Sequence, residues 1–176
     1  MKKFLLFLVF AFSLCFGQSS NLPMKNADFS AFLMNYETPF HGTISNAETV
    51  IKLRIEKAEK NSARPEQYSV SGYSEVEEGN RTNFSGEIIF TQKYNVKDLP
   101  DEMLVFGDFV LKELNSGEHS GVFTGKIRIQ SPKVITKTSR AGVTCRGKWK
   151  NYSGNLDYDV WWANFVPKDI SKVVFK

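Results

Sequence analysis

The sequence predicts an all-β protein: an antiparallel up-and-down meander of eight to ten strands that closes into a barrel, with a short N-terminal helix after a signal peptide. Residues 84–88, 123–127 and 145–149 share one pattern, in which an apolar residue, a glycine and a second apolar residue alternate with polar ones. A period of two is typical of a half-buried strand. Turn motifs at 77–80 and 115–117 separate consecutive strands, which indicates hairpins and therefore a meander.

Five glycines favour a closed barrel over the main alternative, a sandwich of two sheets. Each has the same parity as the apolar residues of its strand: Gly72, Gly86, Gly107, Gly125 and Gly147. A glycine in the middle of a strand weakens it and calls for an explanation. Either the strands coil sharply at barrel corners, or another backbone or a ligand passes close to the glycine. The second explanation would make the glycines the floor of a cavity.

The N-terminus has the features of a secretory signal. Lysines at positions 2 and 3 precede an apolar run at 4–12, and Cys15 and Gly17 supply the small residues of a cleavage site. The run is too short for a permanent transmembrane segment, which needs roughly 20 residues, and no later stretch is long and apolar enough. We therefore expect no transmembrane segment and cleavage after Gly17.

This cleavage divides the chain into a signal peptide, residues 1–17, and a single β-barrel domain, residues 18–176. We expect the mature protein to be secreted or periplasmic. Lipid anchoring through Cys15 is the alternative, but Leu14 before it is larger than the residue usual at that position. Removal of the two N-terminal lysines lowers the net charge from +4 to +2, which implies no particular partner. We expect no intracellular nucleic acid as a partner.

The elements follow in order along the chain. A short helix is expected from about Asp28 to Tyr36, with Asp28 as its cap and Pro39 after its end. A turn is expected around residues 99–101. Strands are expected at 40–44, 49–57, 67–76, 82–91, 103–114, 120–130, 134–138, 143–150, 159–166 and 172–175.

The order of short motifs between residues 68 and 149 resembles that of small exported bacterial proteins with a lipocalin-like or avidin-like (calycin-like) meander. The motifs are 68–73, 84–86, 109–113, 121–125 and 147–149. The resemblance implies a calycin-like barrel and an exported location in bacteria. It implies no particular activity, although binding of a small ligand is what the fold suggests by analogy.

Catalytic and metal-binding patterns are absent from the sequence, so we expect neither an enzyme nor a cofactor or metal site. The histidines, His41 and His119, are 78 residues apart and flank no ligand motif. Cys145 is the only cysteine after the signal and occupies the position that Phe84 and Phe123 occupy in the other two repeats. We therefore expect Cys145 to be a small buried residue rather than a nucleophile.

Aromatic residues make up 14% of the chain and supply the candidate ligand-binding residues. In a strand, the adjacent Trp161 and Trp162 face opposite sides, so one of them is expected on the outside. The predicted function is that of a secreted, non-catalytic protein that binds a small apolar or amphipathic ligand, or an envelope component, in the barrel interior or at its mouth. The candidate residues are Trp149, Trp161, Trp162 and Phe123.

A basic stretch gives an alternative function. Residues 119–156 contain eight lysines and arginines and no acid. Five of these cations alternate along the outward faces of two strands: Lys126, Arg128, Arg146, Lys148 and Lys150. As a stripe, they suit a cell-envelope interaction protein, either a hydrolase inhibitor or a binder of polyanions or glycans. They also suit a solvated face whose charges are balanced by neighbouring acidic strands.

Overall fold

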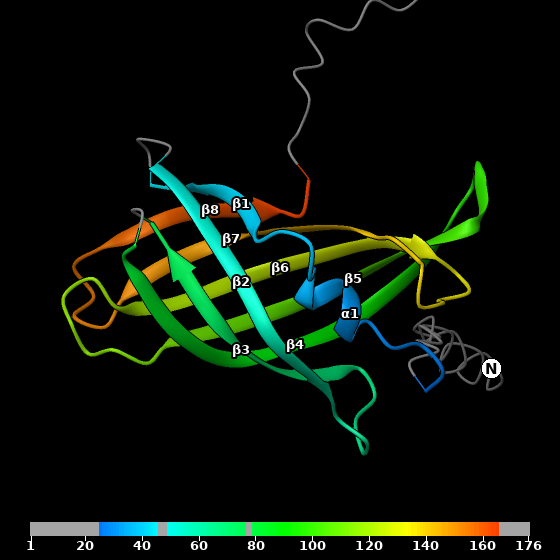
Figure 1. Ribbon diagram of the computed structural model, residues 1–176, viewed down its shortest axis with the longest axis horizontal. Coiled ribbons are helices and arrows are strands. Elements are labelled where there is room, and N and C mark those ends of the chain that lie inside the picture. Colours follow the sequence, from blue (N-terminus) through cyan, green and yellow to red (C-terminus); the bar gives the residue numbers. More distant parts are fainter. Residues whose placement is uncertain (1–24, 46–48, 77–78, 166–176) are drawn as a thin grey trace, which may run out of the picture.

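The computed structural model describes residues 25–45, 49–76 and 79–165, and these form one helix and eight strands (Figure 1). The eight strands run antiparallel, and each pairs with the next in the chain. The elements are α1 (Ser30–Met34), β1 (Phe40–Ile44), β2 (Thr49–Lys60), β3 (Gln67–Glu75), β4 (Arg81–Val96), β5 (Leu99–Glu113), β6 (Gly121–Pro132), β7 (Gly142–Asn151) and β8 (Asp157–Ala163). The predicted all-β up-and-down meander with one short helix is confirmed, with eight strands.

Pairing of β1 with β8 closes the sheet into a ring, in which Gly42 lies opposite Trp162. The ring is uneven because its strands differ in length. β1 has 5 residues and β8 has 7, whereas β4 has 16 and β5 has 15. The wall is therefore low where the first and last strands meet, and the β4–β5 hairpin extends beyond the ring at the other side (Figure 1).

The short helix α1 lies against the wall beside β2 (Figure 1). Phe29, just before the helix, and Leu33 within it are fully buried, and the Phe29 ring packs against Tyr68 of β3 and Phe90 of β4. Two cations of β2 hold the backbone of the segment: Arg54 donates to the carbonyl of Asn35, and Lys60 donates to the carbonyl of Ala27. The helix is shorter than expected, and its N-cap residue is Phe29 rather than Asp28. The Asp28 carboxylate accepts a hydrogen bond from the Ser30 N–H.

Tyr68 connects the α1 segment to the ring. Its hydroxyl oxygen accepts a hydrogen bond from the Phe29 N–H at 3.1 Å, and burial raises the pKa of Tyr68 to about 12. Tyr68→Phe leaves this buried N–H without an acceptor, so we expect the free energy of unfolding at neutral pH to fall by about 1–2 kcal/mol. Urea denaturation followed by tryptophan fluorescence measures the loss.

The same variant has a distinct pH signature. An unfolded tyrosine ionises near pH 10, whereas Tyr68 in the fold ionises only near 12. Its contribution to stability is therefore complete below pH 10 and is lost as the pH rises through 12. The stability difference between wild type and Tyr68→Phe should shrink over this window, and a difference that stays constant up to pH 11 would contradict the assignment.

The interior is filled by alternate residues of each strand, and the glycines of the repeated pattern lie on this inner side. A Cβ atom added to Gly125 would lie 2.2 Å from the Arg146 carbonyl oxygen, and one added to Gly147 would lie 2.0 Å from that of Thr124. The neighbouring backbone fills the space that a side chain needs. Of the expected explanations for the glycines, close passage of another backbone is confirmed.

Two details differ from the expectations. Residues 134–138 form no strand and lie in the connection between β6 and β7. Residues 99–101 begin β5 instead of forming a turn, because the hairpin turn falls at 97–98. The alternative of a two-sheet sandwich is excluded for the described residues, since the strands close on themselves as expected. The expected signal peptide with Cys15 and the expected strand at 172–175 lie outside the described residues.

Candidate binding groove on the outer face

A groove of about 510 Å³ lies on the outside of the ring, over β5 to β8. Alternation along each strand directs one set of side chains outward, and neighbouring strands bring these sets together. Basic and aromatic side chains line the groove: Phe106, Lys126, Arg128, Arg146, Trp161 and Phe165. The groove therefore combines cations with apolar walls.

The strand register fixes the arrangement. Lys126 of β6 lies opposite Arg146 of β7, and Arg128 lies opposite Thr144. Trp161 of β8 follows beside Arg146, and Phe106 of β5 lies beside Arg128. The groove therefore has a cationic floor on the two central strands and an aromatic side chain on each flanking strand.

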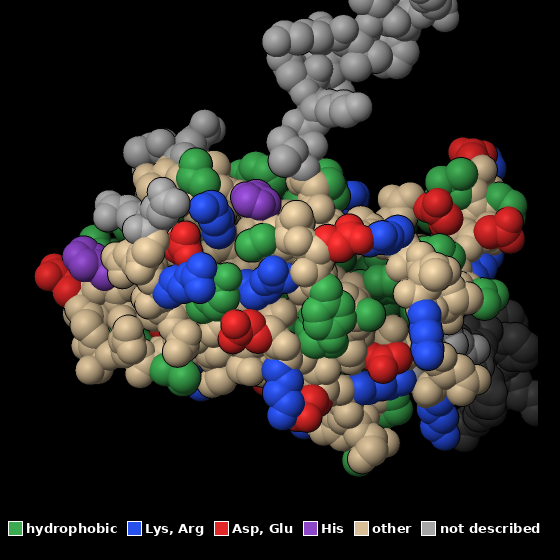
Figure 2. All heavy atoms as spheres, in the orientation of Figure 1, with side chains coloured by type: hydrophobic (Ala, Val, Ile, Leu, Met, Phe, Trp, Pro, Cys, Tyr) green, Lys and Arg blue, Asp and Glu red, His purple; other side chains and the backbone are tan. Residues whose placement is uncertain are grey.

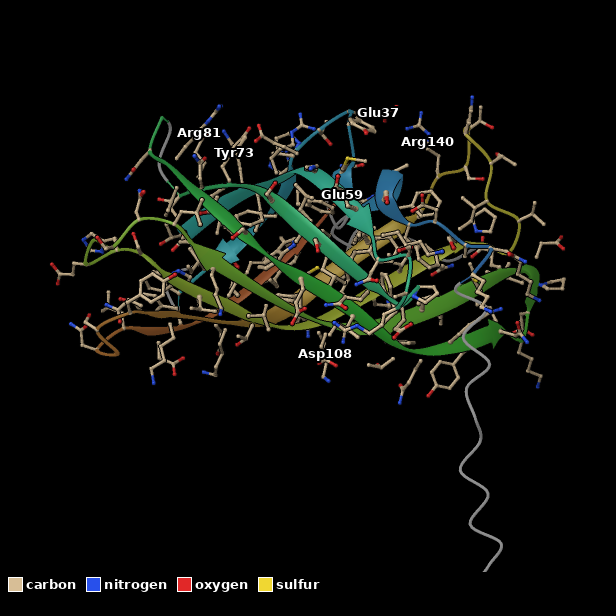
Figure 3. All side chains as sticks on the ribbon, turned by 90° about the horizontal axis from the view of Figure 1, so that it is seen from below. Glu37, Glu59, Tyr73, Arg81, Asp108 and Arg140 are labelled. Carbon is tan, nitrogen blue, oxygen red and sulfur yellow. The ribbon has the colours of Figure 1, made fainter. Side chains whose placement is uncertain are left out.

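The predicted cationic stripe is partly neutralised. The Lys126 ammonium forms an ion pair with Asp108, which projects outward on the side of the ring opposite Arg81 and Tyr73 (Figure 3). The Lys148 ammonium lies 3.2 Å from Asp157 and 3.3 Å from Asp159, and these hydrogen bonds raise the pKa of Lys148. The expectation of charge balance between neighbouring strands therefore holds at these two lysines.

Arg128 and Arg146 differ from these lysines. Both are exposed, and neither forms an ion pair or hydrogen bond with any side chain in the part of the chain that the structure describes. Lys150 is also exposed, lies across from Asp157 in the register and does not line the groove. Two of the three cations of the stripe that form no ion pair among the described residues, Arg128 and Arg146, thus lie at the groove.

On the face that β2 crosses, by contrast, Lys and Arg side chains are interspersed with Asp and Glu (Figure 2). Glu75 on β3 accepts a hydrogen bond from Arg81 at 2.7 Å and lies 3.7 Å from Lys52. The hydrogen bond from Arg81 lowers the pKa of Glu75. Lys52 and Arg81 thus share a carboxylate partner on a neighbouring strand, which Arg128 and Arg146 do not have among the described residues.

Three of the four residues predicted to bind an apolar ligand lie in the interior. Trp149, Trp162 and Phe123 are almost fully buried, and the ring centroid of Phe123 lies 6.4 Å from that of Trp149 and 5.8 Å from that of Trp162. The fourth, Trp161, lies on the outside and lines the groove. The expectation that the adjacent tryptophans face opposite sides is confirmed.

Cys145 is buried with these aromatic residues. Burial raises the pKa of its thiol, and Cys145 lies opposite Trp162 in the strand register. The outward-facing positions of β7, Thr144 and Arg146, lie on the other side of the wall. Within residues 25–45, 49–76 and 79–165, no group of three or more His, Cys, Asp or Glu side chains is placed to hold a metal ion.

Glu113 is a buried carboxylate that the sequence reading did not single out. It accepts hydrogen bonds from the Ser74 hydroxyl at 2.7 Å, the Gly121 N–H at 2.8 Å and the Trp149 indole N–H at 2.9 Å. The sequence did contain a signal for its burial, because Glu113 continues the alternation that directs Phe109 and Leu111 inward. These three donors satisfy the carboxylate and fix the end of β5 to three other strands, β3, β6 and β7.

Within the described part, no helix has the length and apolar character needed to cross a membrane. Comparison with known proteins gives no relative from which a function could be transferred. No family model, no curated protein and no solved structure matches the chain.

Proposed function

We propose that this chain is a non-catalytic binding protein whose outer groove over β5–β8 takes an anionic ligand with an apolar part. The observation that carries the proposal is the placement of Arg128 and Arg146, which have no carboxylate partner among the described residues, between aromatic side chains. An arginine beside an apolar wall holds an anion more strongly than one in open water, because the local dielectric constant is lower.

The register adds a second argument. Lys126 and Arg146 lie directly opposite each other on neighbouring strands, and like charges in this position destabilise a sheet. Asp108 relieves this repulsion from the Lys126 side only. An anion bound over Arg146 would relieve it from the other side, so ligand binding and sheet stability favour the same arrangement.

Binding in the interior has less support. Phe123, Trp149 and Trp162 pack against one another, and Phe109 lies with its ring centroid 5.1 Å from that of Trp162. A ligand in this position would have to displace aromatic contacts that fill the core. The outer groove already offers volume, and its walls include Trp161 from the same candidate set.

The wider setting of the proposal is an exported bacterial protein, secreted or periplasmic, that acts as a cell-envelope interaction protein. Eight strands in up-and-down order are the arrangement of lipocalin-like and avidin-like barrels, which supports a calycin-like relationship and a binding role. The residues that we propose to carry binding are Arg128, Arg146, Lys126 and Trp161.

Isothermal titration calorimetry with eight-carbon amphiphiles tests the proposal. Octanesulfonate should bind, whereas octyl glucoside and octyltrimethylammonium should bind at least ~10-fold more weakly. Raising the salt from about 0.05 M to about 0.5 M should weaken the binding of octanesulfonate several-fold, since the site is open to solvent. Equal binding of the three amphiphiles would overturn the proposal.

Matched variants locate the site. The double variant Arg128→Gln/Arg146→Gln should weaken octanesulfonate binding ~10-fold or more. Lys150→Gln removes an exposed cation of the same strand that does not line the groove, so it should leave the affinity unchanged. An affinity that falls equally in both variants would show a general charge effect and contradict a site at the groove.

A further inference from the structure

Four neighbouring outward positions form a compact cluster at the floor of the groove. β6 contributes Lys126 and Arg128, and β7 contributes Arg146 and Thr144. Directly opposed side chains have Cβ atoms about 5 Å apart, and diagonal ones about 7–8 Å. Three cations and one hydroxyl therefore project from one compact patch, in which Asp108 pairs with the Lys126 ammonium.

The positive surface does not extend from this patch as a continuous row. The next outward cation on β7 is Lys148, and Asp157 and Asp159 occupy its ammonium group. On the side of β5, Asp108 bounds the patch at Lys126. A polyanion with charges spread along a chain would meet carboxylates on both sides, whereas a single compact anion would not.

Apolar side chains border the same patch. Trp161 lies beside Arg146, and Phe106 lies beside Arg128. Tyr94 extends the second wall, with its ring edge-on to Phe106 at a centroid distance of 5.7 Å. The body that carries the anion therefore meets aromatic surface in two directions.

We propose, on the basis of the proposed function, that the ligand is a phosphate monoester carried on an apolar body, with its phosphate oxygens held by Arg128, Arg146 and Thr144. A monoester carries a charge of about −1.5 to −2 at pH 7 and three strong acceptor oxygens. Arginine donates to such oxygens in pairs through its planar guanidinium. A carboxylate has one charge and two oxygens, and leaves part of this donor set unused.

The test compares ligands that share an eight-carbon chain or a phosphate. Octyl phosphate should bind at least ~10-fold more tightly than octanoate or octanesulfonate, and at least ~10-fold more tightly than inorganic phosphate. Heparin, as an extended polyanion, should bind more weakly per site than octyl phosphate. Equal affinity for octanoate, or tighter binding of heparin, would overturn the phosphate assignment while leaving a general anion groove intact. No binding of any anionic amphiphile would remove both proposals.

Two variants separate the parts of the ligand. Trp161→Ala should weaken the binding of octyl phosphate several-fold and leave the binding of inorganic phosphate unchanged. The reason is that, in this proposal, the indole contacts only the apolar body. Thr144→Val keeps the β-branched shape and removes the hydroxyl, so it should weaken octyl phosphate and inorganic phosphate by the same factor, about 3-fold to 10-fold. Inorganic phosphate that binds as tightly as octyl phosphate, or a Thr144→Val variant with wild-type affinity for both, would contradict the assigned contacts.

Discussion

Gly125→Ala should lower the free energy of unfolding by about 3 kcal/mol, a large share of the stability of a small domain. The added methyl group would lie 2.2 Å from the Arg146 carbonyl oxygen and 2.6 Å from the Gly147 Cα. Both are backbone atoms of β7, so no rotation of a side chain relieves the contact. The strands must separate, and the hydrogen bonds between β6 and β7 weaken.

Chemical denaturation in urea measures this loss, and Gly117→Ala is the matched control. Gly117 lies in the turn between β5 and β6, where an added Cβ meets only the Ser120 hydroxyl at 3.9 Å. Its substitution should change the stability by less than about 0.5 kcal/mol. If Gly125→Ala were as mild as Gly117→Ala, the close approach of the two strands would be wrong.

The same substitution links the glycines to the groove. Gly125 lies opposite Gly147, and their neighbours Lys126 and Arg146 are the opposed cations on the other side of the wall. Separating the strands at the glycines would move these cations apart. In a folded Gly125→Ala protein we therefore expect weaker binding of octyl phosphate together with lower stability, whereas the Lys150→Gln variant should show neither change.

The strands were predictable because their alternation is local. A half-buried strand must place apolar side chains at every second position, and the repeats at 84–88, 123–127 and 145–149 record this directly. The ends of β4 and β5 were less predictable, since their hairpin extends past the core and its residues, such as Tyr94, are exposed. Only the pairing between the two strands defines these ends, and no alternation of buried and exposed side chains marks them in the sequence.

The candidate site was predictable only in part. The sequence shows which cations face outward, and this gave Lys126, Arg128, Arg146, Lys148 and Lys150 as a set. Which of them keep their charge unbalanced depends on partners from other strands, such as Asp108 and Asp159. The aromatic walls of the groove come from β5 and β8. These residues are far from the cations along the chain, so the sequence alone does not show that they lie beside the cations.

Glu113 is the buried residue whose replacement should cost most. Glu113→Ala removes the acceptor of the Gly121 N–H and the Trp149 indole N–H, both of which are fixed in place and buried. Two unsatisfied donors and the vacated volume together should lower the free energy of unfolding by about 4 kcal/mol.

Glu113→Gln should be much milder, at about 1 kcal/mol, because the amide can divide the three contacts. Its oxygen can accept from Gly121 and Trp149, and its NH₂ group can donate to the Ser74 hydroxyl, which is free to rotate. Only the extra strength of hydrogen bonds to a charged acceptor is lost. Urea denaturation should therefore rank the variants as wild type, Glu113→Gln and Glu113→Ala, in order of falling stability.

A double-mutant cycle with Trp149→Phe tests whether these hydrogen bonds carry the effect. Trp149→Phe removes one of the two fixed donors, so Glu113→Ala should cost at least about 1 kcal/mol less in that background than in wild type. Additive losses of stability would mean that Glu113 and Trp149 stabilise the protein independently. Equal losses for Glu113→Gln and Glu113→Ala would mean that the negative charge matters rather than the acceptor geometry. Coupling between the two residues is expected because one carboxylate oxygen serves both strands: it joins the end of β5 to the start of β6 and to the indole that β7 places in the core.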